Sequence, residues 1–312
     1  MINTKAELDS AIQKCLYDGA GIEIYVGLKS DNIRRANISS DLQSEILEMF
    51  SNELAEKILN SEYRILPVST TEEAKDAIYR YDLDTKDAFK IFDEVLDPDG
   101  DISLFSFKDD GIANIAYLLL VISTVENAIV LYRPIPSVSL YNHKKGLFIR
   151  KSDDLFEKVE EDFIRISTGI EFFKINDDIF CFNLQKLQQS FHIDSILVGS
   201  ANHQIEKLNN RNLVKNIDKL KEYCSDTAIA RKLSKIVDNS PILNSDKISN
   251  ESIVSFINDN SAFLKHIKTN QGQIEITSKE AAKQFIKLLN DNYLKSELST
   301  LKYDSSSKSI IE

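Results

Sequence analysis

The sequence predicts an α/β or α+β fold, with an acidic N-terminal α/β domain over residues 1–110 and an antiparallel-rich mixed sheet merging into a helical region over residues 111–312. Capping residues followed by apolar residues at helical spacing mark the first and last thirds. Apolar runs separated by turn residues mark the middle. Charge also divides the chain, because residues 1–110 carry 24 Asp and Glu against 12 Lys and Arg, whereas residues 111–312 carry 25 against 26.

Three capping-box patterns predict helices in the N-terminal domain. They lie at residues 4–7, 40–43 and 70–73, and each precedes apolar residues spaced by three or four positions. The third helix is expected to continue through Ile78. Between the first two helices, the alternation of apolar residues over 22–28 predicts a half-buried strand.

The middle of the chain is predicted to be rich in strands. Residues 112–131 are apolar enough to test for a membrane span, but Glu126 and Asn127 favour a buried β-hairpin. A second hairpin is expected where Asn176 and Asp177 separate two apolar runs. Candidate strands are 115–122, 126–133, 146–150, 162–166, 170–175 and 178–183, with a short helix over 153–160.

After Leu184 the sequence predicts mainly helices. The clearest one covers residues 278–295, with Ser278 as its N-cap and Phe285 and Leu289 in its apolar stripe. The other helices are expected at 184–190, 194–208, 213–223, 226–237, 247–257 and 259–267, with a short strand at 273–277.

Motifs of common enzyme classes are absent from the sequence. The chain has no Gly-rich phosphate loop, no His-Glu-x-x-His and no Gly-x-Ser-x-Gly. Its three cysteines and four histidines lie far apart, which indicates neither a zinc site nor a disulfide framework. We therefore expect no cofactor, no metal ion and no catalytic activity. A metal-dependent nuclease is the alternative, because Glu73-Ala74-Lys75 matches the Glu-x-Lys part of nuclease cores, although we expect it on a helix face.

The most distinctive polar feature is the segment Asn127–Ser152, which contains no Asp or Glu and which we call the basic strip. Clustered Lys and Arg neutralise phosphates, so the strip is a candidate for sequence-independent DNA binding. A cationic sheet edge that limits aggregation, or a dock for the acidic domain, are the alternatives. The candidate DNA contacts are Arg133, Lys144, Lys145, Arg150 and Lys151.

A second basic stretch spans residues 211–235 and includes Lys215, Lys219 and Arg231. Asp218 and other acidic residues are interspersed in it, which is typical of solvated helices. An extension of a DNA-binding track is the alternative interpretation.

The C-terminal third contains the run Phe285–Ser299, followed by Tyr303 and Lys308. It resembles the closing motif of the KwaB-like family of Kiwa anti-phage defence proteins, a helix followed by Tyr-Leu-x-Ser-Glu-Leu-Thr and then by a Tyr and a Lys. Here Ser299 replaces the usual Thr, and Thr300 stands where a Gly is common. Similar stretches at Ala128–Pro134, Ile170–Phe182 and Leu184–Phe191 extend the resemblance over about residues 112–308.

The resemblance implies a DNA-binding component of Kiwa-type defence that lacks an established catalytic activity. It implies a small multi-pass membrane partner, KwaA, and a homo-oligomer, such as a dimer, at the inner membrane. Because Met1–Ser10 is polar and no signal peptide is recognised, we expect a cytoplasmic chain that the partner recruits to the membrane.

Three functions follow from these observations. The first is binding of duplex DNA with little sequence preference, through the basic strip and with Tyr303 and Lys308 of the closing motif as further candidate contacts. Those two residues could equally close the fold. The alternatives are a metal-dependent nuclease of the same defence context, and a protein-interaction scaffold that does not bind nucleic acid.

Overall fold

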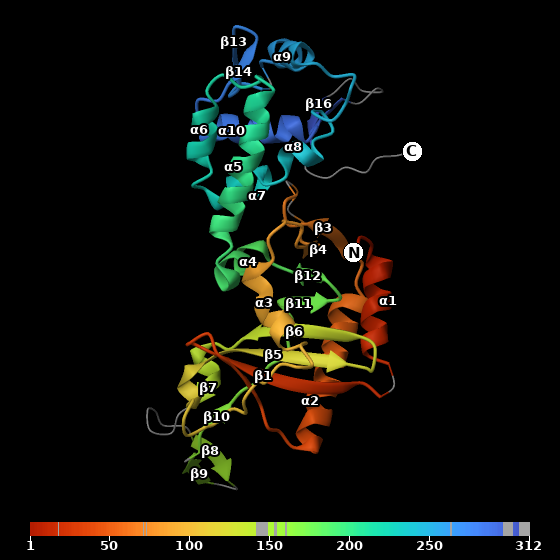
Figure 1. The fold of residues 1–312 in the computed structure, drawn as a ribbon, viewed down its shortest axis with the longest axis vertical. Coiled ribbons are helices and arrows are strands. Elements are labelled where there is room, and N and C mark those ends of the chain that lie inside the picture. Colours follow the sequence, from red (N-terminus) through yellow and green to blue (C-terminus); the bar gives the residue numbers. More distant parts are fainter. Residues whose placement is uncertain are drawn as a thin grey trace. The chain divides into compact units, whose positions relative to one another are not determined.

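The computed structural model places the chain in two compact units (Figure 1). The first, which we call the sheet unit, contains residues 1–65, 78–80 and 89–186. The second, the helical unit, contains residues 66–77, 81–88 and 187–312. The structure describes all residues except 18, 71, 73, 142–148, 153–154, 160, 263, 296–301 and 306–312.

An eight-stranded sheet has the order β2-β1-β5-β6-β11-β12-β4-β3, and the neighbours from β2 to β4 pair antiparallel. This confirms the predicted α/β class with a largely antiparallel sheet. Its strands are β1 (Gly21–Leu28), β2 (Ile33–Arg35), β3 (Arg64–Pro67), β4 (Ala77–Arg80), β5 (Ile115–Ser123), β6 (Ala128–Pro134), β11 (Phe172–Ile175) and β12 (Asp178–Cys181).

One face of the sheet carries a continuous row of apolar cross-strand partners. Ile24, Leu120, Leu131, Phe173 and Phe180 follow one another from β1 to β12, and none is more than 4% exposed. The rings of the last two residues are stacked, with centroids 5.0 Å apart. Each such side chain contributes about 1.5–3 kcal/mol on burial, so this row is the centre of the core.

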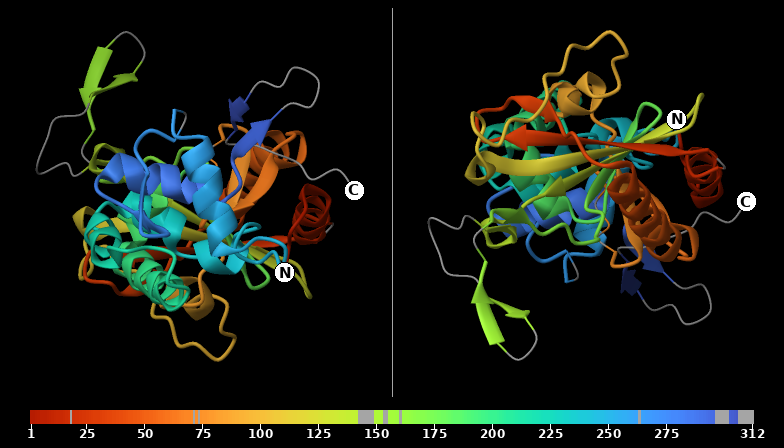
Figure 2. Two further views of the ribbon diagram at one scale, coloured as in Figure 1. Left: turned by 90° about the horizontal axis from the view of Figure 1, so that it is seen from above. Right: turned by 90° about the horizontal axis from the view of Figure 1, so that it is seen from below.

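Helices α1 (Lys5–Cys15) and α2 (Ser40–Leu54) cover this face, and a π-helical turn over Ala55–Leu59 extends α2 (Figures 1 and 2). Thr4 caps α1 in a complete capping box with Glu7, as the sequence predicts. Leu8, Ile12, Cys15, Ile46, Phe50 and Leu54 point into the core.

The opposite face is built around Tyr132. Its ring stacks on that of Tyr117 at 4.8 Å and contacts Phe92 of α3 (Lys90–Glu94) at 6.3 Å. The Tyr117 ring covers Gly27, where an added Cβ would lie 2.1 Å from ring atoms, so only glycine fits beneath it. The sheet is therefore buried on both faces around Tyr132, whose pKa is raised by this burial.

The two hairpins that the sequence predicts are present. In the pairing of β5 with β6, Tyr117 lies opposite Pro134 and Ser123 lies opposite Ala128. This confirms that the apolar segment near residue 120 is a buried hairpin. β11 and β12 join through a turn in which Asn176 adopts a left-handed φ of 52°. No helix in the described part of the chain is long and apolar enough to cross a membrane.

In the helical unit, α5 packs against α6, α7 and α8, and α10 also contacts these three helices. Phe285 and Leu289 of α10 are fully buried, as predicted. The helices are α5 (Asp194–Asn210), α6 (Ile217–Tyr223), α7 (Thr227–Leu233), α8 (Ile236–Asn239), α9 (Asn250–Asp259) and α10 (Lys279–Leu289), and α4 (Leu184–Phe191) precedes them.

Four short strands of the helical unit form two antiparallel pairs, β13 (Lys268–Asn270) with β14 (Gln273–Glu275) and β15 (Tyr293–Lys295) with β16 (Lys302–Asp304). The remaining short strands of the sheet unit are β7 (Leu140–Tyr141), β8 (Ile149–Ser152), β9 (Leu155–Lys158) and β10 (Phe163–Ile164).

The division expected at residue 110 does not coincide with that between the two units. β1, from the acidic N-terminal part, pairs with β5 along its whole length. Residues on both sides of position 110 therefore belong to one sheet, and the change in charge balance does not mark a change of core.

Two predicted helices are strands in the structure. Ile78, expected in a third capped helix, lies in β4 with no exposed surface, because β4 pairs with β12 and completes the core. The short helix expected over 153–160 is wrong for the same reason, since Leu155–Lys158 pairs with β8. Long-range pairing overrides local helix propensity at both places.

Two further predictions near the C-terminus are wrong. The helix expected over 259–267 is absent from its described residues, because Asn260 ends α9 and its side-chain amide donates to Phe256 O at 2.7 Å. The last helix ends at Leu289 rather than at residue 295, since Asp291 turns left-handed with a φ of 54°.

The central row yields a stability prediction. Phe173→Ala should lower the free energy of unfolding by about 3–5 kcal/mol, because it opens a cavity beside Phe180. Chemical denaturation measures this loss. Tyr17→Ala, which removes a ring that is 72% exposed, is the control and should change the free energy by less than about 0.5 kcal/mol. Equal losses in the two variants would contradict the central position of Phe173.

Candidate nucleic-acid interface

Arg133, the first candidate contact of the basic strip, is engaged within the sheet unit. It lies near the end of β6 and is partly buried. Its Nη1 donates to Gly169 O at 2.6 Å, and its Nη2 donates to Ser167 Oγ at 2.7 Å. Lys57 donates to the carbonyl of Ile170, the next residue. The two cations thus fix the loop that leads into β11, which gives Arg133 a positioning role.

The other four candidate contacts of the basic strip lie in or next to segments outside the described residues. Lys144 and Lys145 lie outside the described residues. Arg150 and Lys151 belong to β8, and their backbone positions pair with Glu157 and Phe156 of β9. These four lysine and arginine residues therefore stay candidates predicted from the sequence.

The second basic stretch is largely neutralised by local partners. Lys219 pairs with Glu222 at 2.8 Å, and Lys235 pairs with Asp84 at 3.0 Å. Arg231 is only 2% exposed and donates to carbonyl oxygens of residues 68 and 70. Most of this stretch thus matches the interpretation as ordinary helix surface.

The closing motif forms a β-hairpin of β15 and β16, which we call the C-terminal hairpin. The register pairs Tyr293 with Asp304, Leu294 with Tyr303, and Lys295 with Lys302. Two lysines therefore stand directly opposite each other, an arrangement that costs stability when nothing neutralises it. Within the described part of the chain, neither lysine forms an ion pair with a carboxylate. The hairpin is thus a paired cationic site.

Asn260 connects this lysine pair to α9. Lys302 Nζ donates to Asn260 Oδ1, and the amide nitrogen of Asn260 donates to Phe256 O at 2.7 Å. Asn260 is 9% exposed and neutral, so it orients the Lys302 ammonium without cancelling its charge. Lys295 is exposed. The two ammonium groups therefore remain available to an anion.

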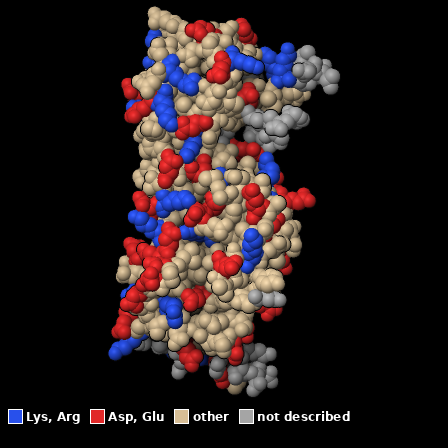
Figure 3. Space-filling view, turned by 45° about the vertical axis from the view of Figure 1, so that its right-hand side comes forward, with Lys and Arg blue, Asp and Glu red and all other residues tan. Residues whose placement is uncertain are grey.

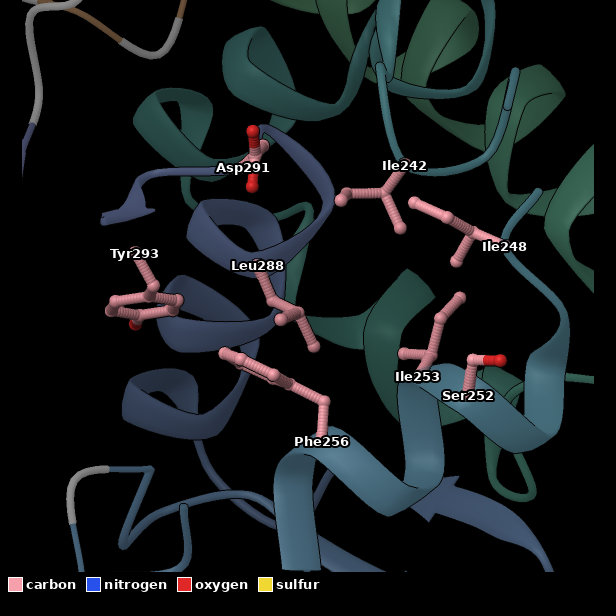
Figure 4. A pocket seen from close by; sticks show the side chains of 8 residues that line it. All are labelled: Ile242, Ile248, Ser252, Ile253, Phe256, Leu288, Asp291 and Tyr293. Carbon is pink, nitrogen blue, oxygen red and sulfur yellow. The ribbon is translucent and has the colours of Figure 1, made fainter. Parts of the chain in front are cut away.

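A pocket of about 280 Å³, which we call the hairpin pocket, opens beside the lysine pair. A second pocket of about 270 Å³, the apolar pocket, shares Phe256 and Tyr293 with it. Figure 4 shows the side chains that line the apolar pocket. The hairpin pocket is lined by Phe256, Asp259, Asn260, Tyr293, Leu294, Lys295 and Lys302. The apolar pocket is lined by Ile242, Ile248, Ser252, Ile253, Phe256, Leu288, Asp291 and Tyr293.

Tyr303 lies in β16 and is 49% exposed, on the opposite face of the hairpin strand from Lys302. Burial and the charge of Asp304 raise the pKa of Tyr293, so this phenol stays neutral beside the lysines. Lys308, the other candidate from the motif, lies outside the described residues. Lys295 and Lys302 were not among the sequence candidates, although they flank the segment 296–301 of the closing motif, which is a signal for them.

Acidic and basic side chains are interspersed on the face drawn in Figure 3, rather than gathered into a broad basic surface. Within the described residues, no group of three or more His, Cys, Asp or Glu side chains converges as a metal site would require. Glu73 of the Glu-x-Lys sequence lies outside them. The lysine pair of the C-terminal hairpin is therefore the most defined candidate for an anion contact.

Arg133 also generates a stability prediction. Gly169 has a φ of +122°, and an added Cβ would lie 2.8 Å from Arg133 Nη1. Gly169→Ala should therefore lower the free energy of unfolding by about 1–3 kcal/mol. Gly199→Ala is the matched control, since Gly199 lies in α5 with nothing within 4 Å, and it should stabilise by about 0.5–1 kcal/mol. Thermal unfolding of both variants checks this, and shifts of the same sign would refute it.

Comparison with known proteins places the chain among its relatives. A family model described as Kiwa protein KwaB-like matches residues 112–299, more than half of the chain. The Kiwa protein KwaB of Escherichia coli O55:H7 (strain RM12579 / EPEC) is 22% identical over 312 residues, which covers 98% of each chain. No solved structure matches. These findings confirm the resemblance carried by the closing motif: the chain belongs to the Kiwa protein KwaB-like family.

Proposed function

We propose that this chain is the DNA-binding component of a Kiwa-type anti-phage defence system, and that it holds duplex DNA by its phosphates with little sequence preference. Family membership supports the role in defence. The observation that carries the DNA contact is the Lys295–Lys302 pair of the C-terminal hairpin. Lys144, Lys145, Arg150 and Lys151 of the basic strip are proposed as additional contacts.

The chemistry of lysine supports phosphate binding without base reading. An ammonium group is a compact point charge, whereas base recognition in the major groove relies mainly on planar or bidentate side chains. Two cationic side chains on facing strands suit neighbouring phosphates of one backbone. The net charge of −11 opposes DNA at long range, so we expect binding that is short-ranged and strongly weakened by salt.

The wider assembly belongs to the same proposal. The chain acts without cleaving the DNA that it holds. It works beside a KwaA-like multi-pass membrane protein, which recruits it from the cytoplasm to the inner membrane, and it functions as a homo-oligomer, in the simplest case a dimer. A dimer would double the number of lysine pairs, and so raise the affinity for a long duplex.

Neutralising the hairpin lysines should weaken DNA binding and flatten its salt dependence. For Lys295→Gln/Lys302→Gln, the slope of log K against log salt should fall by roughly 1 per lysine, because each phosphate contact releases counterions. Fluorescence anisotropy with linear duplexes of unrelated sequence, across a salt series, measures this slope. Lys144→Gln/Lys145→Gln should lower the slope further if the basic strip contributes.

The control is Lys219→Gln/Lys283→Gln. It removes the charges of two lysines whose side chains are each 52% exposed and pair with neighbouring glutamates. Its slope should match that of the unmodified protein. Each assay includes Mg²⁺, and DNA length is checked on a gel. Shortened DNA would replace the proposal with the nuclease, whereas no binding at low salt would leave the interaction scaffold.

A further inference from the structure

We propose that the hairpin pocket binds one nucleotide of an unpaired DNA strand, with its phosphate on the lysine pair and its base against Phe256. This inference rests on the proposed DNA-binding function and makes it more specific. It predicts that the chain prefers DNA with single-stranded ends or gaps over fully paired duplex. All the residues that line this pocket belong to the helical unit.

The apolar wall of the pocket suits a nucleobase. Phe256 projects from α9 and keeps 40% of its surface exposed, and Leu294 of β15 keeps 39% exposed. Both line the same pocket. Two exposed apolar side chains that line a single pocket form a small apolar surface, which a flat apolar ligand can cover. A base has a flat apolar face that stacks on an aromatic ring, and such stacking does not depend on sequence.

The phosphate end is defined by the lysines. Lys295 and Lys302 line the same pocket as Phe256 and lie opposite each other on the hairpin. The side-chain oxygen of Asn260 accepts a hydrogen bond from Lys302, and its side-chain nitrogen donates one to the backbone oxygen of Phe256. Asn260 therefore links the cationic side to the aromatic side and acts as a positioning residue. A mononucleotide has the same two ends, an anion and an aromatic ring.

Asp259 gives the pocket a preference among bases. Its carboxylate is exposed, lines the pocket, and accepts a hydrogen bond from Ser255 Oγ at 3.4 Å. A carboxylate repels phosphate, so the phosphate is directed to the lysines and the base edge to Asp259. Carboxylates accept hydrogen bonds from exocyclic amino groups, such as N4 of cytosine, which thymine lacks. The pocket should therefore favour cytosine over thymine.

An unpaired strand is favoured over an acidic peptide as the occupant. An acidic peptide would satisfy the lysines but would place further carboxylates beside Asp259 and would leave the Phe256 ring uncovered. In duplex DNA the bases are stacked and unavailable, so a pocket of this kind requires a base that is already free. An unpaired end offers both parts at no cost of unpairing.

Binding to three labelled duplexes tests the proposal. They share one paired region and carry a single-stranded dC overhang, a dT overhang or no overhang. Fluorescence anisotropy should give an affinity roughly tenfold higher with the dC overhang than with the blunt duplex, and a smaller gain with dT. Phe256→Leu should reduce the gain to about twofold or less, and Phe256→Tyr should retain it. Asp259→Asn should remove the difference between dC and dT.

The controls separate this inference from DNA binding itself. Tyr17→Ala removes an exposed ring of the sheet unit and should leave the affinity ratio unchanged. Circular dichroism verifies that each variant is folded. Equal affinity for all three duplexes would overturn the pocket proposal and preserve duplex binding. Binding of free dCMP without binding of any duplex would overturn the DNA-binding function. Capture of polyglutamate in preference to every DNA would overturn both.

Discussion

The register of the antiparallel sheet is the constraint on which the sheet unit depends. Ile24, Leu120, Leu131, Phe173 and Phe180 face the same core only if four consecutive strand pairs keep their alignment. A slip of one residue in any pair would turn that strand's apolar side chains to the other face. Because the other face is also buried, around Tyr132, the slip would cost packing on both sides. The register thereby fixes where β6 ends, and with it the position of Arg133 and the loop before β11.

The sequence was most informative where local signals and long-range packing agree. Both hairpins, the capping box of α1 and the buried stripe of α10 were predicted, because turn residues and apolar spacing specify them locally. β4 was missed, since Ile78 has a helix-like neighbourhood and becomes a strand only through pairing with β12. The lysine pair was missed for a related reason. Lys295 and Lys302 are seven positions apart, and only the pairing of β15 with β16 brings them together.

Counting charges along the sequence is a poor guide to an anion site in this fold. Several cations are bound by groups of the chain itself. Arg133 donates to a loop carbonyl, Arg231 donates to backbone carbonyls, and Lys174 pairs with Asp93. Each satisfies buried acceptors or a single carboxylate, which is the usual reason for a cation with little exposed surface. The hairpin lysines differ, because one is oriented by a neutral amide and the other is exposed. Among the described residues, what distinguishes a candidate contact is therefore a lysine that forms no ion pair with a carboxylate, and not the density of Lys and Arg.

An acidic protein that binds DNA has to resolve a conflict between its overall charge and its local site. At physiological ionic strength the Debye length is about 8 Å, so most of the net charge of −11 is screened from a ligand at the C-terminal hairpin. Within that distance the two lysines outnumber Asp259, the one carboxylate that lines the same pocket, and their mutual repulsion is relieved when an anion lies between them. The same short range excludes long-distance attraction of free duplex DNA. A chain of this kind should depend on being brought close to its DNA, which is the role that a membrane partner would have in the proposed function.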